Sequence, residues 1–232
     1  SLAIESVRTQ TFQDWELIVI CDSDSDGTVE VMGEWTKKDS RIRYIQIPRS
    51  GRIAIVSNAA LKAARGEYIA ILDDDDYWID PQKLEKQVAF LDAHKDHVGC
   101  GSAFMMVDAE GRELGRARKP GTDHAIRARA LFANPMANST TLFRRSVAEQ
   151  VGWYDETMLQ FADWDFWLKM GLAGTLYNAP DYLLAYRMWD KGSSFMKQRE
   201  NAASAIRIVK RYRHDYPHPY FAAFMARVYY MY

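Results

Sequence analysis

Four consecutive aspartates, Asp73 to Asp76, are the residues of this sequence best suited to chemistry. They directly follow residues 68–72, an apolar run whose β-branched and aromatic side chains predict a buried strand. Adjacent carboxylates repel one another unless a positive charge lies close to them. A divalent cation supplies that charge, and oxygen ligands suit Mg²⁺, Mn²⁺ or Ca²⁺ better than zinc. The sequence therefore predicts a cation site at the end of this strand, with a solvated acidic loop as the alternative.

A second acidic segment, residues 22–27, matches the first six positions of an EF-hand calcium loop. That loop needs a glutamate at its twelfth position, where this chain has Gly33, and a strand rather than a helix precedes the segment. We therefore interpret Asp22 as the end of a strand, on the same sheet edge as Asp73. Ligands of open parallel sheets bind outside the carboxyl ends of the strands. Asp22 and Asp73 are thus predicted to border one site for a polar ligand and its cation.

The elements that must position these carboxylates alternate between strand and helix in the first half of the chain. Hydrophobic periodicity and turn residues predict strands over 16–21, 42–47 and 68–72, and helices over 29–37, 53–64 and from Pro81 onward. This is the βαβ rhythm of a parallel sheet. The second half is less regular, with predicted strands over 98–108 and 140–143, a loop over 115–123, a helix over 163–171 and helical sequence from 200.

Composition limits the classes of protein that fit. The chain has 232 residues, 48% of them hydrophobic, and a net charge of −1, so its overall field does not indicate a nucleic-acid partner. Two cysteines without metal-site spacing fit a reducing compartment. No signal peptide and no run of about 18 apolar residues is present, so we expect a cytoplasmic protein. The chain starts without methionine in a helix-like segment, residues 2–7, which suggests a start inside a longer protein.

Several segments together resemble a family 2 glycosyltransferase of the GT-A fold. They are residues 6–20, Asp22 with 26–28, 51–58, 64–78, 83–85, 152–156, 162–168 and 186–187. The resemblance, which spans about residues 2–195, implies an α/β fold with a Rossmann-like, mostly parallel central sheet flanked by helices. It implies a nucleotide-sugar-binding half over 1–108, an acceptor-binding and catalytic half over 109–195, and a helical extension over 196–232. The family's first strand would precede residue 1, so the domain is expected to lack that strand.

The resemblance also implies an activity and a set of roles. Such enzymes transfer a sugar, with inversion, from a nucleoside-diphosphate sugar to an acceptor hydroxyl. We expect a UDP-sugar donor, a saccharide or lipid-linked acceptor, and a place in bacterial-type cell-surface polysaccharide synthesis. Mn²⁺ or Mg²⁺ would assist departure of the diphosphate. The implied metal ligands are Asp75 and Asp76, and the implied donor-binding residues are Asp22, Arg52, Asp73, Asp74 and Arg187, with the side chain of Asp74 expected to point away.

The family's catalytic carboxylate corresponds to Asp163, which would take the proton of the acceptor hydroxyl. Two departures from the family pattern accompany it. Ala162 replaces the glutamate that commonly precedes the base, and Trp189 stands where a histidine often completes metal or phosphate binding. Asp165 is a rival base, and Asp163 as a helix N-cap is the structural alternative. Lys191 is a further candidate for the diphosphate.

Two other functional classes remain open from the sequence. A non-catalytic GT-A-like domain that binds a nucleotide or a glycan would fit the two departures, and a phosphotransferase or receiver-like domain would use the aspartates as nucleophiles. The segment 212–232 has an apolar helical face with basic neighbours. It is expected to dock on the catalytic domain or to contact a membrane surface.

Overall fold

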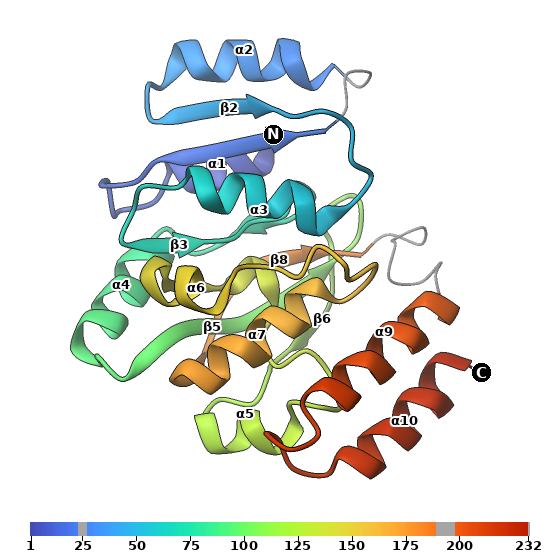
Figure 1. Cartoon of the computed structure of the whole chain (residues 1–232). Coiled ribbons are helices and arrows are strands. Elements are labelled where there is room, and N and C mark those ends of the chain that lie inside the picture. The colour runs from blue at the N-terminus through green and yellow to red at the C-terminus, as the bar shows by residue number, and fades with distance from the viewer. Residues whose placement is uncertain (23–26, 189–197, 232) are drawn as a thin grey trace.

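The structure, a computed structural model, describes residues 1–22, 27–188 and 198–231 (Figure 1). Its helices are α1 (Leu2–Arg8), α2 (Thr28–Lys38), α3 (Ile53–Ala63), α4 (Lys83–Ala93), α5 (Asp123–Arg129), α6 (Arg145–Val151), α7 (Ala162–Ala173), α9 (Gln198–Arg211) and α10 (Pro219–Met231), with a 3₁₀ turn, η1, over Asn138–Thr140. Its strands are β1 (Leu17–Cys21), β2 (Ile42–Gln46), β3 (Tyr68–Ala70), β4 (Tyr77–Trp78), β5 (His97–Val107), β6 (Glu113–Ala117), β7 (Leu142–Arg144) and β8 (Thr175–Arg187).

The strands form two sheets. β1 and β2 pair in parallel, and a six-stranded sheet has the order β3-β7-β5-β8-β4, with β6 also paired to β5. The predicted α/β class is confirmed, but the larger sheet is mixed rather than mostly parallel. Only β5 and β8 run parallel in it, and the other pairs are antiparallel. β6 explains part of the difference, because a short turn after β5 is enough to form an antiparallel hairpin. The loop predicted over 115–123 is therefore wrong for residues 115–117.

The long strand β8 was not predicted, because its sequence contains Asn178, Pro180 and Asp181. Pairing with β5 moves from Ser102 opposite Ala179 to Ala103 opposite Tyr182, which leaves residues 180 and 181 as an insertion in the ladder. A bulge of this kind tolerates proline within a strand. Beyond it, β8 continues to Arg187 and reaches the edge of the sheet where the aspartate run lies.

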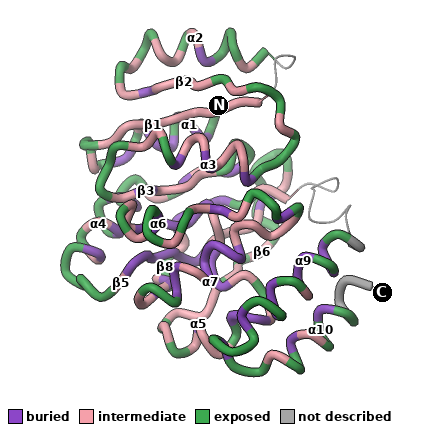
Figure 2. Tube along the Cα trace, in the orientation of Figure 1, coloured by how far each residue is buried: buried purple, intermediate pink, exposed green. Residues whose placement is uncertain are grey.

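Buried residues lie along β5 and α7, which are largely purple in Figure 2, and clusters of buried side chains pack on both faces of the six-stranded sheet. On one face, Leu84 and Leu91 of α4 pack with Cys100, Leu142 and Leu184. On the other face, α7 contributes several aromatic and apolar side chains, which pack against β5 and β7 in a cluster that includes Val98, Phe143, Phe166, Trp167 and Met170. A third cluster joins α7 to the α9–α10 hairpin through Trp164, Leu168, Ala205, Ile208 and Ala222. Because α7 belongs to two clusters, its position is fixed from both sides.

The two-stranded sheet is less enclosed. Every residue of β1 is only half-buried. The partial exposure of β1 follows from its strand pairing. Within the described residues, β1 pairs only with β2, and β3 only with β7, while side chains of both β1 and β3 line a common groove.

Candidate active site

One large groove contains nearly all of the predicted site residues. It has a volume of about 2090 Å³ and extends from β1 and α3 past β3 to the start of α7 and the end of β8. The predicted site residues that line it are Asp22, Arg52, Asp73, Asp74, Asp75, Asp163 and Arg187. Asp76 is not part of the lining, because it is only 1% exposed. The structure therefore brings together carboxylates that are up to 141 positions apart in the sequence (Asp22 and Asp163).

Asp22 lies directly after β1 and is held by a turn at residues 50–51. Its Oδ2 accepts hydrogen bonds from Ser50 N at 3.2 Å, Ser50 Oγ at 2.9 Å and Gly51 N at 3.0 Å. Gly51 has a φ of +62°, a backbone conformation that glycine adopts without steric cost. The Gly51 N–H, followed by the Ser50 hydroxyl, lowers the pKa of Asp22. Asp22 is thus an ionised carboxylate with a fixed orientation at the groove. Residues 23–26, the remainder of the acidic segment before Gly27, lie outside the described residues.

The aspartate run makes a tight turn between β3 and β4. Asp76 N donates to Asp73 O at 3.2 Å, and Asp73 N donates to the buried Ser139 Oγ at 3.1 Å. Asp76 Oδ1 accepts from Arg187 N at 2.9 Å, which joins the turn to the end of β8. Asp73, Asp74 and Asp75 remain exposed toward the groove. The run is therefore not a loosely solvated loop, because its first and last members are anchored to the sheet.

Burial and neighbouring negative charges raise the pKa values of two carboxyl groups in this turn. Asp73 retains solvent-accessible surface toward the groove, yet protein surrounds it on its other sides. This burial, together with the charge of Asp76, raises the pKa of Asp73 to about 7. Burial also raises the pKa of Asp76 to about 6, and Asp75 contributes in the same direction. Near neutral pH the turn is therefore poised between protonated and ionised forms, a state that a bound cation would convert to the ionised one.

The donor set of the turn fits a hard divalent cation. Asp76 Oδ2 is buried and lacks a hydrogen-bond partner in the part of the chain that the structure describes. No three His, Cys, Asp or Glu side chains come together as a ready-made metal site in that part. Mg²⁺ and Mn²⁺ need no such cage in proteins that bind phosphates, because one or two carboxylates hold the ion and phosphate oxygens and waters complete its shell. Asp75 and Asp76 match this pattern.

The two candidate bases of α7, Asp163 and Asp165, have different surroundings. Asp163 lines the groove and is half-buried, and burial raises its pKa. Its charge also contributes to the raised pKa of Asp73, so the two carboxylates are electrostatic neighbours. Asp165 is fully buried on the other side of the helix, where its Oδ1 lies 2.5 Å from Arg211 Nη1. Asp165 is therefore a structural residue, and Asp163 is the α7 carboxylate that faces the groove. No side-chain cap at the start of α7 involves Asp163, because the N-cap position is Phe161.

The two predicted arginines differ in their surroundings. Arg52 is exposed at the rim of the groove, and its Nη1 donates to Glu156 O at 3.2 Å. Arg187 lies at the end of β8 beside Asp76, with its guanidinium carbon 5.9 Å from the centre of the Tyr77 ring. Arg187 therefore places a positively charged residue next to the aspartate turn. Trp189 and Lys191 lie outside the described residues.

Sequence reasoning assigned no role to several residues of the groove. Tyr186 is one of them, and it lies near Asp163 and three members of the aspartate turn. Burial raises the pKa of this tyrosine to about 12, and the charges of Asp76, Asp75, Asp73 and Asp163 add to the effect. A useful signal was present, since Tyr186 directly precedes Arg187. Two further groove residues, Lys119 and Asn134, carry no such signal, because they lie in irregular segments far from any acidic motif.

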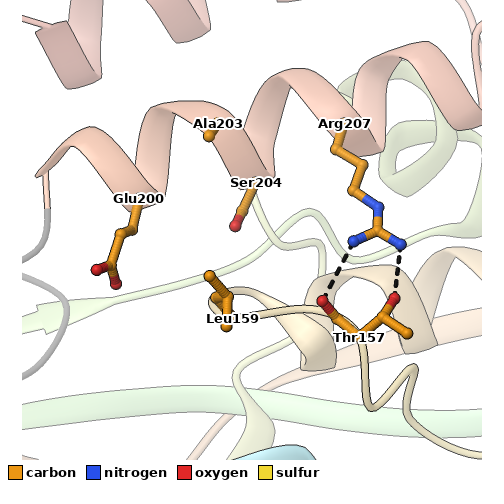
Figure 3. A pocket seen from close by; sticks show the side chains of 6 residues that line it. All are labelled: Thr157, Leu159, Glu200, Ala203, Ser204 and Arg207. Atoms are coloured by element: carbon orange, nitrogen blue, oxygen red, sulfur yellow. Dashed lines mark hydrogen bonds between the residues drawn. The ribbon is translucent and has the colours of Figure 1, made fainter.

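A second, smaller pocket of about 330 Å³ lies between α9 and the loop at residues 157–159 (Figure 3). Arg207 of α9 donates to Thr157 O at 3.2 Å and to Thr157 Oγ1 at 2.6 Å across it. None of the predicted site residues lines this pocket. Its described contacts attach α9 to the loop that precedes α7. No described helix is both long enough and apolar enough to span a bilayer.

Comparison with known proteins identifies a family for this chain. A family model described as Glycosyl transferase family 2 matches residues 2–152. The chain is 30% identical to EpsE of Bacillus subtilis (strain 168), a protein named as a glycosyltransferase, over 202 residues that make up 84% of this chain and 70% of EpsE.

Solved structures of the GT-A fold match nearly the whole chain. S. aureus TarS 1–349 in complex with UDP-GlcNAc has a TM-score of 0.73 at 18% identity, covering 98% of this chain and 66% of TarS 1–349. The mannosyltransferase PcManGT of Pyrobaculum calidifontis, in complex with GDP-Man and Mn²⁺, has a TM-score of 0.69 at 17% identity, covering 98% of this chain and 64% of PcManGT. The chain thus spans 64 to 70% of EpsE, TarS 1–349 and PcManGT, and 40% of a longer S. aureus TarS chain. The fold predicted from the sequence is confirmed, and the receiver-like alternative no longer applies.

Proposed function

Because this chain belongs to glycosyl transferase family 2, we propose that it transfers a sugar, with inversion, from a nucleoside-diphosphate sugar to an acceptor hydroxyl. A UDP-sugar is the proposed donor and a saccharide or lipid-linked saccharide the proposed acceptor. In this proposal residues 1–108 bind the donor and residues 109–195 contribute the base and contact the acceptor. The proposed setting is the synthesis of a bacterial-type cell-surface polysaccharide or glycoconjugate in the cytoplasm.

One observation carries the proposal: a single groove is lined by a fixed, ionised Asp22, by Asp163 and by Asp73 to Asp75 of the aspartate turn. The groove is large enough for a nucleotide sugar together with an acceptor, since small-molecule sites commonly measure about 300 to 1,000 Å³. The TarS structure is a complex with UDP-GlcNAc and the PcManGT structure a complex with GDP-Man and Mn²⁺, which supports the same ligand class here.

Each part of the groove has a proposed role at the donor. Asp22 contacts the nucleoside, with Arg52 and Asp74 nearby, and Asp73 contacts the ribose or the water shell of the cation. Asp75 and Asp76 would hold Mn²⁺ or Mg²⁺, and the bound ion would supply positive charge for the departing diphosphate. Arg187 adds a fixed positive charge beside the turn. These roles use every predicted donor and metal residue.

The transfer step follows from the position of Asp163. The acceptor oxygen forms a bond to the anomeric carbon of the donor while the bond from that carbon to the diphosphate oxygen breaks. The diphosphate leaves with the bonding electron pair, and Asp163 takes the proton of the acceptor hydroxyl. Burial raises the pKa of Asp163 and so makes it a stronger base than an exposed aspartate. Attack from the face opposite the leaving group produces inversion.

A donor screen tests this function directly. The wild-type chain is incubated with a panel of UDP-, GDP- and other nucleotide sugars with Mn²⁺, and release of the nucleoside diphosphate is measured. We expect turnover of at least one donor and a loss of about 100-fold or more in Asp75→Asn, whose residual activity no longer responds to Mn²⁺. Asp215→Asn is the matched control, because Asp215 is an exposed residue remote from the groove lining.

Two outcomes of the screen would contradict the proposal. Binding of a donor without hydrolysis or transfer in every condition would indicate the non-catalytic, GT-A-like alternative. Unchanged metal dependence in Asp75→Asn would show that the cation binds elsewhere.

The acceptor side of the proposal includes a membrane contact. α10 exposes Tyr220, Phe221, Phe224 and Val228, while Ala222 and Ala226 of the same helix are buried. Exposed aromatic side chains on one helix face suit an interfacial contact where a lipid-linked acceptor lies. Co-sedimentation with anionic phospholipid vesicles, compared between the wild type and Phe221→Ser/Phe224→Ser, tests this contact, and equal binding of both proteins would refute it.

A further inference from the structure

The carboxylate of Asp163 is held by a neighbour from an irregular segment of the chain. Asn134 Nδ2 donates a hydrogen bond to Asp163 Oδ2 at 2.6 Å. The orientation of the Asn134 amide is itself determined, because its Oδ1 accepts a hydrogen bond from Met136 N at 3.2 Å. The amide therefore presents its N–H group, and not its oxygen, to Asp163. A donor in this position fixes the direction of one carboxylate oxygen.

Lys119 contacts the segment that carries Asn134 and lies near the same Asp163 carboxylate. Its Nζ donates to the backbone oxygen of Asn134 at 2.9 Å, and the side chain is half-buried at the groove. Burial lowers the pKa of Lys119, whereas the charge of Asp163 acts in the opposite direction. The ammonium group thus restrains the segment that carries Asn134 and also supplies a positive charge near Asp163.

The two segments that bear Lys119 and Asn134 are tied together by Asn178 of β8. Asn178 Nδ2 donates to Pro120 O at 2.8 Å and to Pro135 O at 3.2 Å, and Asn178 N donates to Gly121 O at 2.9 Å. Space for this side chain depends on Gly101 of β5, since a Cβ there would lie 2.4 Å from Asn178 Oδ1. A buried asparagine in the sheet therefore sets the spacing between two segments that both reach Asp163.

We propose that Asn134 and Lys119 are positioning residues for Asp163, holding its carboxylate in the orientation in which it accepts the proton of the acceptor hydroxyl. This inference rests on the proposed function, since it assigns Asp163 as the base. Hydrogen-bonded supports of this kind hold a reacting group in its productive geometry, and their loss lowers turnover without removing the reacting group itself.

The charged and titratable groups that face Asp163 allow the sign of the effect to be derived. They are Lys119, Asp73, Tyr154 and Tyr186. Burial raises the pKa of Asp163, while backbone N–H groups of α7, the Lys119 charge and the Asn134 amide lower it. Removal of Asn134 Nδ2 or of the Lys119 charge should therefore raise the pKa of Asp163 further. The acidic limb of the pH–rate profile should move to higher pH in both variants.

Two readouts on the full chain test the proposal. The first is the titration of the Asp163 carboxyl in protein labelled with ¹³C-aspartate, with the resonance assigned from its absence in Asp163→Asn. The second is the pH dependence of nucleoside diphosphate release from the donor identified in the screen. The variants are Asn134→Ala and Lys119→Met, with Lys119→Arg as the conservative variant. Arg118→Met is the matched control, because Arg118 lies on the same segment but is exposed and contacts Tyr182 instead.

We expect the Asp163 titration to move to higher pH in Asn134→Ala and Lys119→Met. Their kcat should fall about tenfold, because the loss of one hydrogen bond to a charged group costs about that factor. The KM for the donor should stay within about twofold of the wild type. Lys119→Arg and Arg118→Met should behave as the wild type. If the titration of Asp163 does not move in either variant, the positioning role is overturned while the proposed function stands. If the titration moves but turnover is unchanged at every pH, Asp163 is not the base, and the proposed mechanism and the positioning role both fail.

Discussion

Asp165 and Arg211 form an ion pair, with the carboxylate buried and the guanidinium partly exposed, that joins the groove-lining helix α7 to the C-terminal hairpin. Arg211 Nη1 lies 2.5 Å from Asp165 Oδ1, and Arg211 Nη2 lies 2.7 Å from Asp155 Oδ2. Asp165 is fully buried and only two residues from Asp163, which lines the groove. The pair therefore fixes both the rotation of α7 and the direction in which Asp163 faces.

The first prediction concerns the stability that this pair provides. Arg211→Met leaves the Asp165 carboxylate buried, with Lys169 Nζ at 3.6 Å as its remaining cation. Removal of the cation beside a fully buried carboxylate should lower the free energy of unfolding by about 2 kcal/mol, less than for a pair buried on both sides because Arg211 is partly exposed, as measured by urea denaturation. Arg213→Met is the control, because Arg213 is exposed and contacts only its neighbour His214 among the described hydrogen bonds. Equal urea midpoints for the two variants would contradict the assignment.

The second prediction concerns the pH dependence of stability at the aspartate turn. The pKa of Asp76 is about 6 in the folded protein, above the ordinary value near 4. An acid whose pKa is raised by folding binds more protons in the folded state than in the unfolded state. Its contribution to the free energy of unfolding is therefore most favourable at low pH and declines as pH rises through about 4 to 6. Asp73, with a pKa of about 7, extends this decline toward neutral pH.

The measurement is the free energy of unfolding between about pH 5 and about pH 7.5 without divalent cations. We expect Asp76→Asn to lose less stability than the wild type over this range, and Asp215→Asn to follow the wild type. Added Mn²⁺ should reduce the decline in the wild type, because the cation favours the ionised carboxylates. A wild-type decline that persists unchanged in Asp76→Asn would show that other groups cause it.

The third prediction concerns Lys83, which is fully buried at the start of α4. Its Nζ donates to Gln87 Oε1 at 2.6 Å and lies 4.1 Å from the centre of the Trp78 ring. Burial lowers the pKa of Lys83 to about 7. A base whose pKa is lowered by folding binds fewer protons in the folded state, so stability should rise as pH increases from about 7 toward about 10. Lys83→Met should lack this rise, whereas the exposed Lys95→Met should retain it, as thermal denaturation at several pH values would show.

Much of the fold was predictable because the first half has strong local signals. The helix predicted over 53–64 is α3 (Ile53–Ala63), and the helix predicted after Pro81 is α4 (Lys83–Ala93). Both have regular apolar faces. β8 was missed because the residues that break its pattern are accommodated by a bulge against β5, which depends on tertiary pairing. β6 was missed for the same reason, since its exposed residues gain their structure from β5.

The candidate site was predictable to the extent that its residues lie in sequence motifs. Asp22, Asp73 and Asp163 belong to recognisable segments, and the groove brings them together. The choice between Asp163 and Asp165 required the structure, because it depends on Arg211, 46 residues further along the chain. Asn134 has no motif at all, and its contact with Asp163 arises only through folding.

The most direct test of the proposed mechanism is the rate of nucleoside diphosphate release by Asp163→Asn, at saturating donor and Mn²⁺, with the donor Kd measured in parallel. Asparagine preserves the shape of the side chain but cannot accept the proton. We predict a rate about 10³-fold below that of the wild type, with the donor Kd unchanged, because a general base of this kind contributes about 10²- to 10⁴-fold. A rate within about threefold of the wild type would contradict the assignment of Asp163 as the base.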